Sequence, residues 1–241
     1  MSLIKVVDRP LIRRQFLHLS GLSSMALLLG SCRISLFEDV VGKTFAPLNE
    51  NVENLLFNPE KIAPEFPADA IEPNALIINS FRGTPIIDSD KFRLIVDGEV
   101  NQPLSLSMAE IQNMALTSII IRHVCVEGWA AIVQWGGVKL RDIITLAQPK
   151  NTVRYAYFVS ADGYYESWDI ASALHPQTLM AYQKNGQPIP IENGAPLRLA
   201  SPIKLGYKQS KWVVRIKLVS NLISNYRGYW EDQGYEWFAG L

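Results

Sequence analysis

The feature that most constrains the fold is a series of short strand-like runs, interrupted by short helical patterns, from residue 75 onward. Phe92–Gly98 and Thr117–Val126 are rich in β-branched and aliphatic residues, as buried strands are. Between them, Ser107–Glu110 forms a capping box and predicts a short helix through Met114. Strands and helices do not alternate strictly, as a doubly wound parallel sheet would require. The pattern therefore favours an α+β or mostly β domain with short helices, and we take the α+β class with mixed β-sheets as the prediction.

The same pattern continues toward the C-terminus. Asp162-Gly163 is a strong hairpin signal between two strand-like runs. An aromatic-rich tail, Tyr226–Phe238, is expected to pack on the domain. The remaining expected elements are two short helices, Leu140–Ile144 and Asp169–Leu174, and the strands Tyr155–Val159, Tyr164–Trp168, Leu197–Ala200 and Val213–Val219.

Composition fits a globular domain and argues against one class of partner. Of the 241 residues, 48% are hydrophobic and 19% are charged, which is typical of a protein with a substantial core. The formal net charge is zero, so bulk charge gives no basis for binding nucleic acid or for coating an anionic membrane. We therefore expect no nucleic-acid partner.

The N-terminal residues resemble an export signal. Arg13-Arg14 precedes a short apolar stretch, Leu19–Gly30, in the manner of a twin-arginine signal. The stretch is shorter than the ~20 apolar residues of a comfortable membrane span. Leu29–Cys32 resembles a lipobox, in which the cysteine is lipidated. An uncleaved apolar anchor and a plain signal peptide are the alternatives.

These features predict three regions and a location. Residues 1–32 are expected to be the signal, residues 33–74 an irregular tether and lead-in, and residues 75–241 the folded domain. The protein is expected in the periplasm or on the outer face of the cytoplasmic membrane, with a lipid anchor at Cys32. Contact with the membrane would then occur only through the signal or the lipid.

Cys125 is the one cysteine outside the predicted signal, so an exported domain would carry a thiol with no disulfide partner in its own chain. A buried apolar cysteine is the ordinary explanation. A Cys/His hydrolase with His175 as the base is a second. A zinc site is poorly supported, because His123 and His175 are the only histidines outside the signal. No dinucleotide-binding, phosphate-loop or haem-attachment motif is present.

The residues around Cys125 give this thiol a family context. Arg122–Trp129 resembles the metal-ligand segment of the oxidoreductase molybdopterin-binding domain, in the sulfite-oxidase-like superfamily. The resemblance is closest to the branch of the periplasmic methionine-sulfoxide reductase catalytic subunit. It covers roughly Ala75 to Ser220 and continues through Trp135–Val138, His175-Pro176, Asn193–Arg198 and Gly206–Lys208.

The resemblance implies a sulfite-oxidase-type molybdopterin-binding fold, with molybdenum and molybdopterin as cofactors. Cys125 would be the metal ligand, and Glu127 would relay protons at the open metal position; an ordinary paired carboxylate is the alternative for Glu127. A soft thiolate suits a redox metal that a dithiolene already holds. The positions that match cofactor-binding residues of the family are Asn79, Arg82, Gly83, Ser160, Asn193, Arg198, Gln209, Ser210 and Lys211.

Two departures bear on the substrate. Val126–Ala130 replaces the arginine-containing run that follows the cysteine in sulfite oxidases, and Arg82 stands where the reductase branch has tyrosine. The resemblance therefore implies two-electron oxygen-atom transfer, most simply reduction of a small-molecule S-oxide or N-oxide. With no haem or flavin motif, electrons would come from a separate, membrane-bound haem protein. A sulfite-type oxidase and a non-catalytic lipoprotein that kept the fold remain alternatives.

Overall fold

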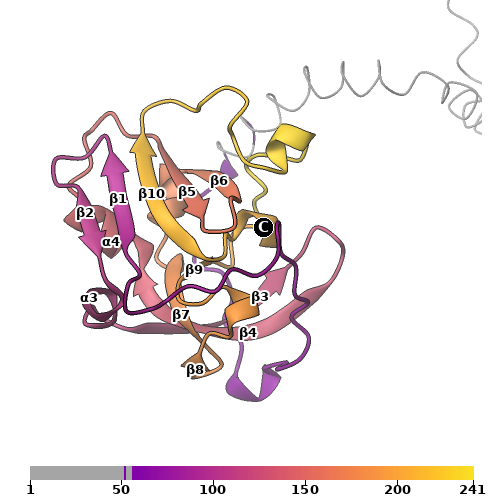
Figure 1. The fold of residues 1–241 in the computed structure, drawn as a ribbon. Helices are drawn as coiled ribbons and strands as arrows, with labels where there is room; N and C mark the ends of the chain where they lie inside the picture. Colours follow the sequence, from indigo (N-terminus) through magenta and orange to yellow (C-terminus); the bar gives the residue numbers. More distant parts are fainter. Residues whose placement is uncertain (1–51, 53–55) are drawn as a thin grey trace, which may run out of the picture. The chain divides into compact units, whose positions relative to one another are not determined.

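Two five-stranded β-sheets form the framework of the domain (Figure 1). The computed structural model describes Val52 and residues 56–241, so the predicted signal and most of the predicted tether lie outside the described residues. The first sheet has the order β2-β1-β10-β5-β6, in which β1 and β10 are parallel and the other pairs antiparallel. Its strands are β1 (Leu94–Gly98), β2 (Leu104–Leu106), β5 (Tyr155–Ser160), β6 (Tyr165–Asp169) and β10 (Val213–Val219).

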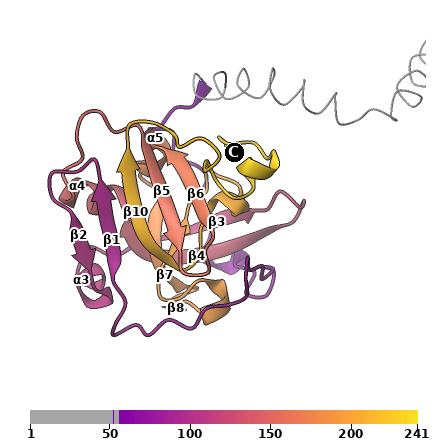
Figure 2. The ribbon, with the colours of Figure 1, turned by 45° about the horizontal axis from the view of Figure 1, so that its top comes forward.

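The second sheet is antiparallel throughout, with the order β3-β4-β7-β8 and β9 paired to β7. Seen from a second direction, it lies behind the first sheet (Figure 2). The two sheets with short connecting helices confirm the predicted α+β class. The strands are β3 (Thr117–Val124), β4 (Ala130–Lys139), β7 (Leu179–Lys184), β8 (Gln187–Pro188) and β9 (Arg198–Ala200).

The helices are short, as the sequence predicts. In α3 (Met108–Gln112) the Ser107 and Glu110 side chains form both bonds of the predicted capping box, but the helix ends two residues before Met114. No helix among the described residues is long and apolar enough to cross a membrane. The other helical elements are α4 (Leu140–Leu146), α5 (Ile170–Ala173), η2 (Ala68–Ala70), η3 (Ile191–Asn193), η4 (Gly206–Lys208) and η5 (Glu231–Gln233).

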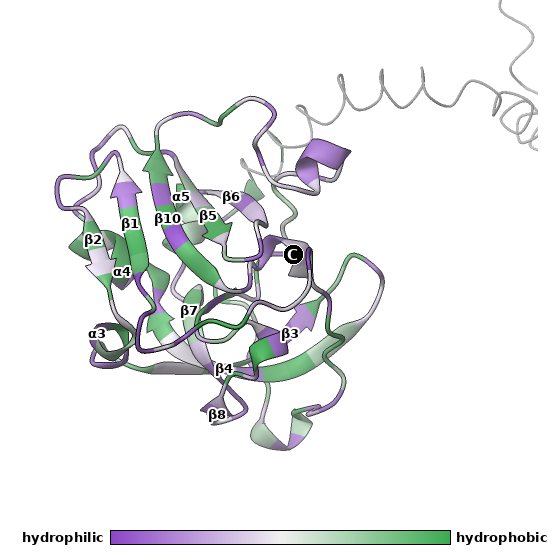
Figure 3. Ribbon diagram, in the orientation of Figure 1, coloured by the Kyte–Doolittle hydropathy of each residue, from purple (hydrophilic) through white to green (hydrophobic). Residues whose placement is uncertain are grey.

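The apolar residues form two cores that share the second sheet. Alternate residues of β7 point to opposite faces, so Met180 packs in one core, while Leu179 and Ala181 pack in the other. The first core also contains residues of α4 and of the first sheet. Hydropathy colouring shows hydrophobic stretches in β1 and β4, whereas in β10 hydrophilic residues interrupt the hydrophobic ones (Figure 3). The predicted strands therefore bury their apolar faces against the second sheet and the short helices.

The part of the lead-in that the structure describes runs along the second sheet. Phe66 N–H donates to the Ile120 carbonyl oxygen at 2.9 Å, and Glu72 N–H donates to that of Ile132 at 3.0 Å. Ala63 N–H donates to the Gln177 side chain at 2.8 Å. The described lead-in is thus hydrogen-bonded to the domain, and the boundary at residue 75 stays a prediction.

Sequence patterns did not predict β4, the longest strand, because Gly136-Gly137 interrupts its apolar run. The register against β7 shifts between these two glycines. An added Cβ at Gly137 would lie 2.1 Å from the Met180 carbonyl oxygen, closer than any side chain can approach. The glycine therefore permits the close approach of β4 and β7.

Replacing Gly137 tests this close approach. We expect Gly137→Ala to lower the free energy of unfolding by about 1–3 kcal/mol, because backbone atoms of β7 must shift. Gly136→Ala is the matched control, because its Cβ would mainly meet the flexible end of Gln183. Urea unfolding of both variants measures the difference. Equal losses at the two positions would contradict the explanation.

Candidate functional site

The turn between β3 and β4 places Cys125 and Glu127 side by side. Val124 pairs with Ala130 at the end of the hairpin. Cys125 N–H then donates to the Trp129 carbonyl oxygen at 2.9 Å and closes the turn. The predicted strand Thr117–Val126 thus ends at Val124, one residue before the cysteine. This tight turn fixes the direction of the thiol.

Glu127 contacts two neighbours of the turn through one carboxylate oxygen. Trp129 Nε1 donates to Glu127 Oε2 at 2.9 Å, and Cys125 Sγ lies 3.6 Å from the same oxygen. Burial, together with the carboxylate of Glu127, raises the pKa of the Cys125 thiol. A thiolate at this position therefore needs a cation, such as a metal ion, to stabilise it.

A cavity of about 350 Å³ opens beside this turn and collects most of the predicted site residues. Its size is within the range of ligand pockets, roughly 300–1,000 Å³. Segments far apart in the sequence contribute to its walls. The predicted residues that line it are Asn79, Cys125, Glu127, Asn193, Arg198, Gln209, Ser210 and Lys211.

Three predicted cofactor residues are not among those that line the cavity. Arg82 and Gly83 are exposed, and the Arg82 guanidinium lies over the ring of Phe81, which does line it. Ser160 is buried at the end of β5, and its hydroxyl has no hydrogen-bond partner among the described residues. The roles of these three residues stay predictions.

Two cations, the buried Arg198 and the half-buried Lys211, line the cavity and form no salt bridge with any described carboxylate. Arg198 is 3% exposed, and its guanidinium donates only to backbone carbonyls, at 2.9 Å to Asn193 and 3.2 Å to Leu199. Burial lowers the pKa of Arg198 to about 9. Lys211 likewise donates to the backbone carbonyls of Asn79 and Glu192. Together these charges favour an anionic ligand.

Two further polar atoms in the cavity wall have no partner in the described part of the chain: His123 Nδ1 and Ser210 Oγ. Burial, followed by the charges of Arg198 and Lys211, lowers the pKa of His123 to about 3, so its imidazole is neutral. Buried polar atoms are normally hydrogen-bonded. These atoms are available to a ligand with donors and acceptors along its edge.

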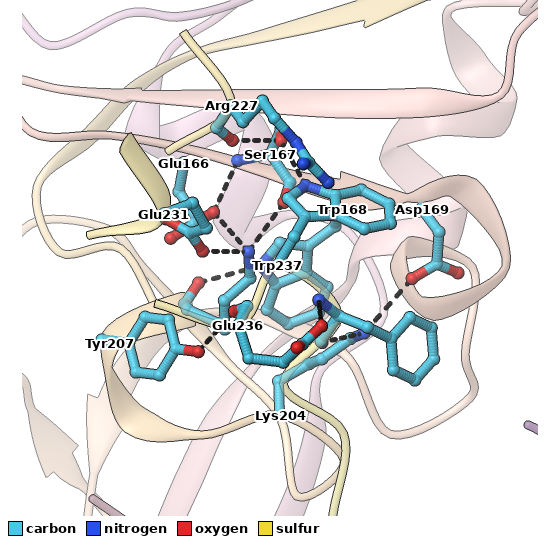
Figure 4. A network of polar contacts seen from close by, with 12 residues as sticks. Glu166, Ser167, Trp168, Asp169, Lys204, Tyr207, Arg227, Glu231, Glu236 and Trp237 are labelled. Carbon is cyan, nitrogen blue, oxygen red and sulfur yellow. Dashed lines mark hydrogen bonds and ion pairs between the residues drawn. The ribbon is translucent and has the colours of Figure 1, made fainter. Parts of the chain in front are cut away.

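The other cations between Arg198 and Arg215 are paired within the chain. Lys204 lies 3.3 Å from Asp169, and Arg215 lies 2.6 Å from Asp97. The ammonium group of Lys208 is fully buried and contacts Glu166, at 2.5 Å, and Glu231. Figure 4 shows Glu166 and Glu231 close together in this network. The run Arg198–Arg215 therefore contains two kinds of cation, and only Arg198 and Lys211 line the cavity.

Gln209 lines the cavity, and its side chain is hydrogen-bonded within the chain, so its predicted contact with the cofactor stays a prediction. Its side-chain amide donates to the carbonyls of Ser201 and Lys204, both at 2.8 Å, and its oxygen accepts from Ser201 N–H at 3.1 Å. Its backbone carbonyl oxygen accepts from Arg198 at 3.4 Å. These bonds orient the loop and the guanidinium, and they commit the amide to the protein itself.

The geometry does not support His175 as a base for Cys125. His175 Nδ1 accepts from Gln177 N–H at 3.2 Å, which leaves Nε2 protonated and donating to the Lys61 carbonyl oxygen at 3.1 Å. His175 is also absent from the residues that line the cavity. Across the described residues, no group of three or more His, Cys, Asp or Glu side chains is arranged to hold a metal ion.

Sequence reasoning missed the aromatic part of the cavity. The tail Tyr226–Phe238 packs on the domain as expected through Trp237 and Phe238, which are 4% and 3% exposed. The same tail also contributes Trp230 and Tyr235 to the lining. An aromatic-rich segment signals packing, and nothing in its local pattern shows which rings reach a distant site.

Comparisons with known proteins show which family the chain is similar to. Residues 81–230 match the oxidoreductase molybdopterin binding domain. The chain is 37% identical, over 98% of its length, to a protein of Azospira oryzae whose provisional name is protein-methionine-sulfoxide reductase subunit YedZ1, and the match covers 90% of that protein. It is 36% identical, over 53% of its length, to the protein-methionine-sulfoxide reductase catalytic subunit MsrP of Xanthomonas axonopodis pv. citri, covering 44% of MsrP.

A solved structure shows the same fold. The sulfane dehydrogenase SoxCD of Paracoccus pantotrophus superposes with a TM-score of 0.55 and 20% identity, over 58% of this chain and 41% of that one. The chain belongs to the oxidoreductase molybdopterin-binding domain family. The predicted family, the sulfite-oxidase-type fold and the identification as an oxidoreductase enzyme are confirmed.

The residues present fit the cofactor that this family implies. Molybdopterin carries a phosphate and a pterin edge rich in hydrogen-bonding groups. Arg198 and Lys211 are cations that form no salt bridge with a described carboxylate. Ser210 supplies a hydroxyl without a hydrogen-bond partner among the described residues. Cys125 supplies a thiol on the same cavity. Arg198, Lys211 and Ser210 would hold the phosphate and pterin, and Cys125 would bind the metal.

Removing the unpaired cation tests its role. Arg198→Gln should weaken retention of the cofactor by about tenfold or more, because charge-assisted hydrogen bonds to an anion are lost. Arg215→Gln is the control, since Arg215 is exposed and pairs with Asp97. Molybdenum per chain, measured by elemental mass spectrometry on protein with an unchanged melting profile, gives the comparison. Full molybdenum in Arg198→Gln would exclude the role.

Lys211 gives the apoprotein a pH dependence of known sign. Burial, followed by the charge of Arg198, lowers its pKa from 10.5 to about 8. Between these values the unfolded chain binds a proton that the folded chain does not, so apoprotein stability should rise with pH from about 8 to 10.5. Chemical denaturation of wild-type and Lys211→Met apoprotein across this range measures the effect. A rise of the same size in the variant would contradict the assignment to Lys211.

Proposed function

We propose that this protein is an exported molybdenum–molybdopterin oxidoreductase that reduces an S-oxide, with N-oxides as the related substrate class. The observation that carries the proposal is one cavity with a single thiol, Cys125, and two cations, Arg198 and Lys211, that form no salt bridge with any carboxylate of the described residues. The names of both relatives, which refer to methionine-sulfoxide reductase, support the S-oxide as substrate.

The residues of the turn suit reduction of an oxide. Overall, a sulfoxide takes up two electrons and two protons, its S–O bond breaks, and a thioether and water leave. When bound, the molybdenum–molybdopterin group supplies the two-electron redox chemistry. Glu127 Oε2 holds and passes a proton, and the bond from Trp129 Nε1 at 2.9 Å keeps this oxygen beside Cys125.

Oxidation of sulfite is less well supported by the chain's own residues. A small dianion needs cations at the open side of the metal, whereas the residues that follow Cys125 are Val126, Glu127, Gly128 and Trp129. Glu127 is exposed on the same turn and would repel an anion. The likeness to the sulfane dehydrogenase concerns the fold alone.

The proposal includes a partner and a location. The relatives are named as a subunit and a catalytic subunit, and this sequence carries no haem-attachment motif of its own. Electrons would come from a separate, membrane-bound haem protein. The signal-like residues 1–32, with a lipid anchor at Cys32, would place the enzyme at the outer face of the cytoplasmic membrane.

Replacing the thiol tests the central claim. Protein matured in a host that makes molybdopterin should contain about one molybdenum per chain and show a molybdenum EPR signal. Cys125→Ser should lose the signal and the reduction of methionine sulfoxide by a reduced viologen dye. Cys32→Ser, in the predicted signal, is the control and should keep both. Correctly matured wild-type protein without molybdenum would contradict the proposal. Faster oxidation of sulfite than reduction of sulfoxide would show that the enzyme works as an oxidase.

A further inference from the structure

The cavity has two zones of different chemistry. Its polar residues lie deep, and Asn193, Arg198 and Ser210 are at most 3% exposed. At the mouth, Trp230 and Tyr235 are 38% and 41% exposed. A ligand that reaches past the mouth therefore meets cations and hydrogen-bonding groups, whereas a ligand held at the mouth meets aromatic faces.

A single turn of the C-terminal tail holds the two rings at the mouth. Gln233 N–H and Tyr235 N–H both donate to the Trp230 carbonyl oxygen at 3.0 Å. The turn that contains η5 therefore brings the rings of Trp230 and Tyr235, which flank it in the sequence, close together. The ring centroids of Trp230 and Tyr235 are 5.0 Å apart, and Tyr235 also meets Tyr207 edge-on at 5.5 Å. Each ring is thus supported by neighbouring rings while one side stays open.

A buried ion cluster fixes this turn to the domain. Glu231, the first residue of η5, contacts the ammonium of Lys208, and the side chains of both are at most 1% exposed. The aromatic wall, which we define as Trp230 and Tyr235, is therefore anchored to η4, and the residues that follow η4 line the cavity. Rings that are ordered before binding lose little entropy when a ligand arrives.

The other exposed residues of the lining are apolar, acidic or uncharged polar, and none of them is a cation. Ile77 and Val126 are 55% and 46% exposed and line the same cavity. Glu127 and Asp162 are the two carboxylates in the lining. An anion would be repelled here, whereas an uncharged molecule with apolar substituents would be accepted. Sulfur also makes favourable contacts with aromatic rings.

We propose that the aromatic wall is a substrate subsite that binds the apolar substituent of an uncharged organic sulfoxide. This inference rests on the proposed function and specifies its substrate class. Trp230 and Tyr235 hold the substituent, so the S–O group is free to face the turn that carries Cys125 and Glu127 in the same cavity. The C-terminal tail thereby sets which sulfoxides the enzyme prefers.

The test compares two sulfoxides that differ only in the substituent. Methyl phenyl sulfoxide and dimethyl sulfoxide are reduced by the loaded enzyme with a reduced viologen dye, and kcat/KM is measured for each. Trp230→Ala and Tyr235→Ala should each lower the preference for the phenyl compound by about tenfold, through KM. Trp230→Phe, which keeps a ring, should restore most of it. Ile223→Ala, at 40% exposure in a neighbouring part of the chain and outside the lining, should leave the preference unchanged.

Equal losses for both sulfoxides, or the same loss in Ile223→Ala, would overturn the subsite. A loss seen only with the haem partner as electron donor would instead make the wall a partner surface and would also overturn it. Equilibrium dialysis of methyl phenyl sulfide against the loaded enzyme separates this inference from the proposed function. Weaker binding of the sulfide in Trp230→Ala supports the subsite even if no sulfoxide is turned over, whereas absence of turnover alone counts against the reductase.

Discussion

The buried contact of Lys208 with Glu166 and Glu231 is the interaction on which the site geometry depends. Lys208 lies in η4, Glu166 in β6 and Glu231 in η5, so one ammonium group joins three segments that are distant in sequence. Burial raises the pKa of Glu166 well above its ordinary value, and the nearby carboxylate of Glu231 raises it further. Removing one member of such a cluster leaves an uncompensated buried charge, which is strongly destabilising. The cluster therefore specifies how the segments meet.

Backbone packing makes this cluster possible. Gly228 lies against both carboxylates, and a Cβ there would be 2.0 Å from Glu231 Oε2 and 2.6 Å from Glu166 Oε1. Ser167 adds a backbone N–H to Glu166 at 2.8 Å and a carbonyl to Lys208 at 3.0 Å. The loop that follows Lys208 carries Ser210 and Lys211 into the cavity. A charge cluster that does not touch the cavity thus positions the side chains that do.

The sequence predicted what depends on neighbours along the chain. The capping box of α3, the Asp162-Gly163 turn and the strand before Cys125 all follow local rules, and the structure confirms them. Cys125 and Arg198, which the family motif marks as site residues, line one cavity in the structure. The sequence could not show which cations between Arg198 and Arg215 form salt bridges. Pairing with Asp97, Asp169 or Glu166 depends on the tertiary fold. Strand β4 was not predicted for a related reason. Its two glycines lie where β4 packs closely against β7, which the local sequence does not show.

The limits of the family match bear on where specificity resides. The family model covers residues 81–230, which include Cys125, Glu127 and the two unpaired cations. The aromatic wall begins at the last matched residue, Trp230, and ends beyond it at Tyr235. The family model therefore covers the residues that would hold the cofactor, and it ends at the first residue of the aromatic wall. Because the tail is anchored through Glu231, its rings can differ in kind while the anchor and the cofactor-facing loop stay in place. Separate control of chemistry and substrate choice follows directly from this arrangement.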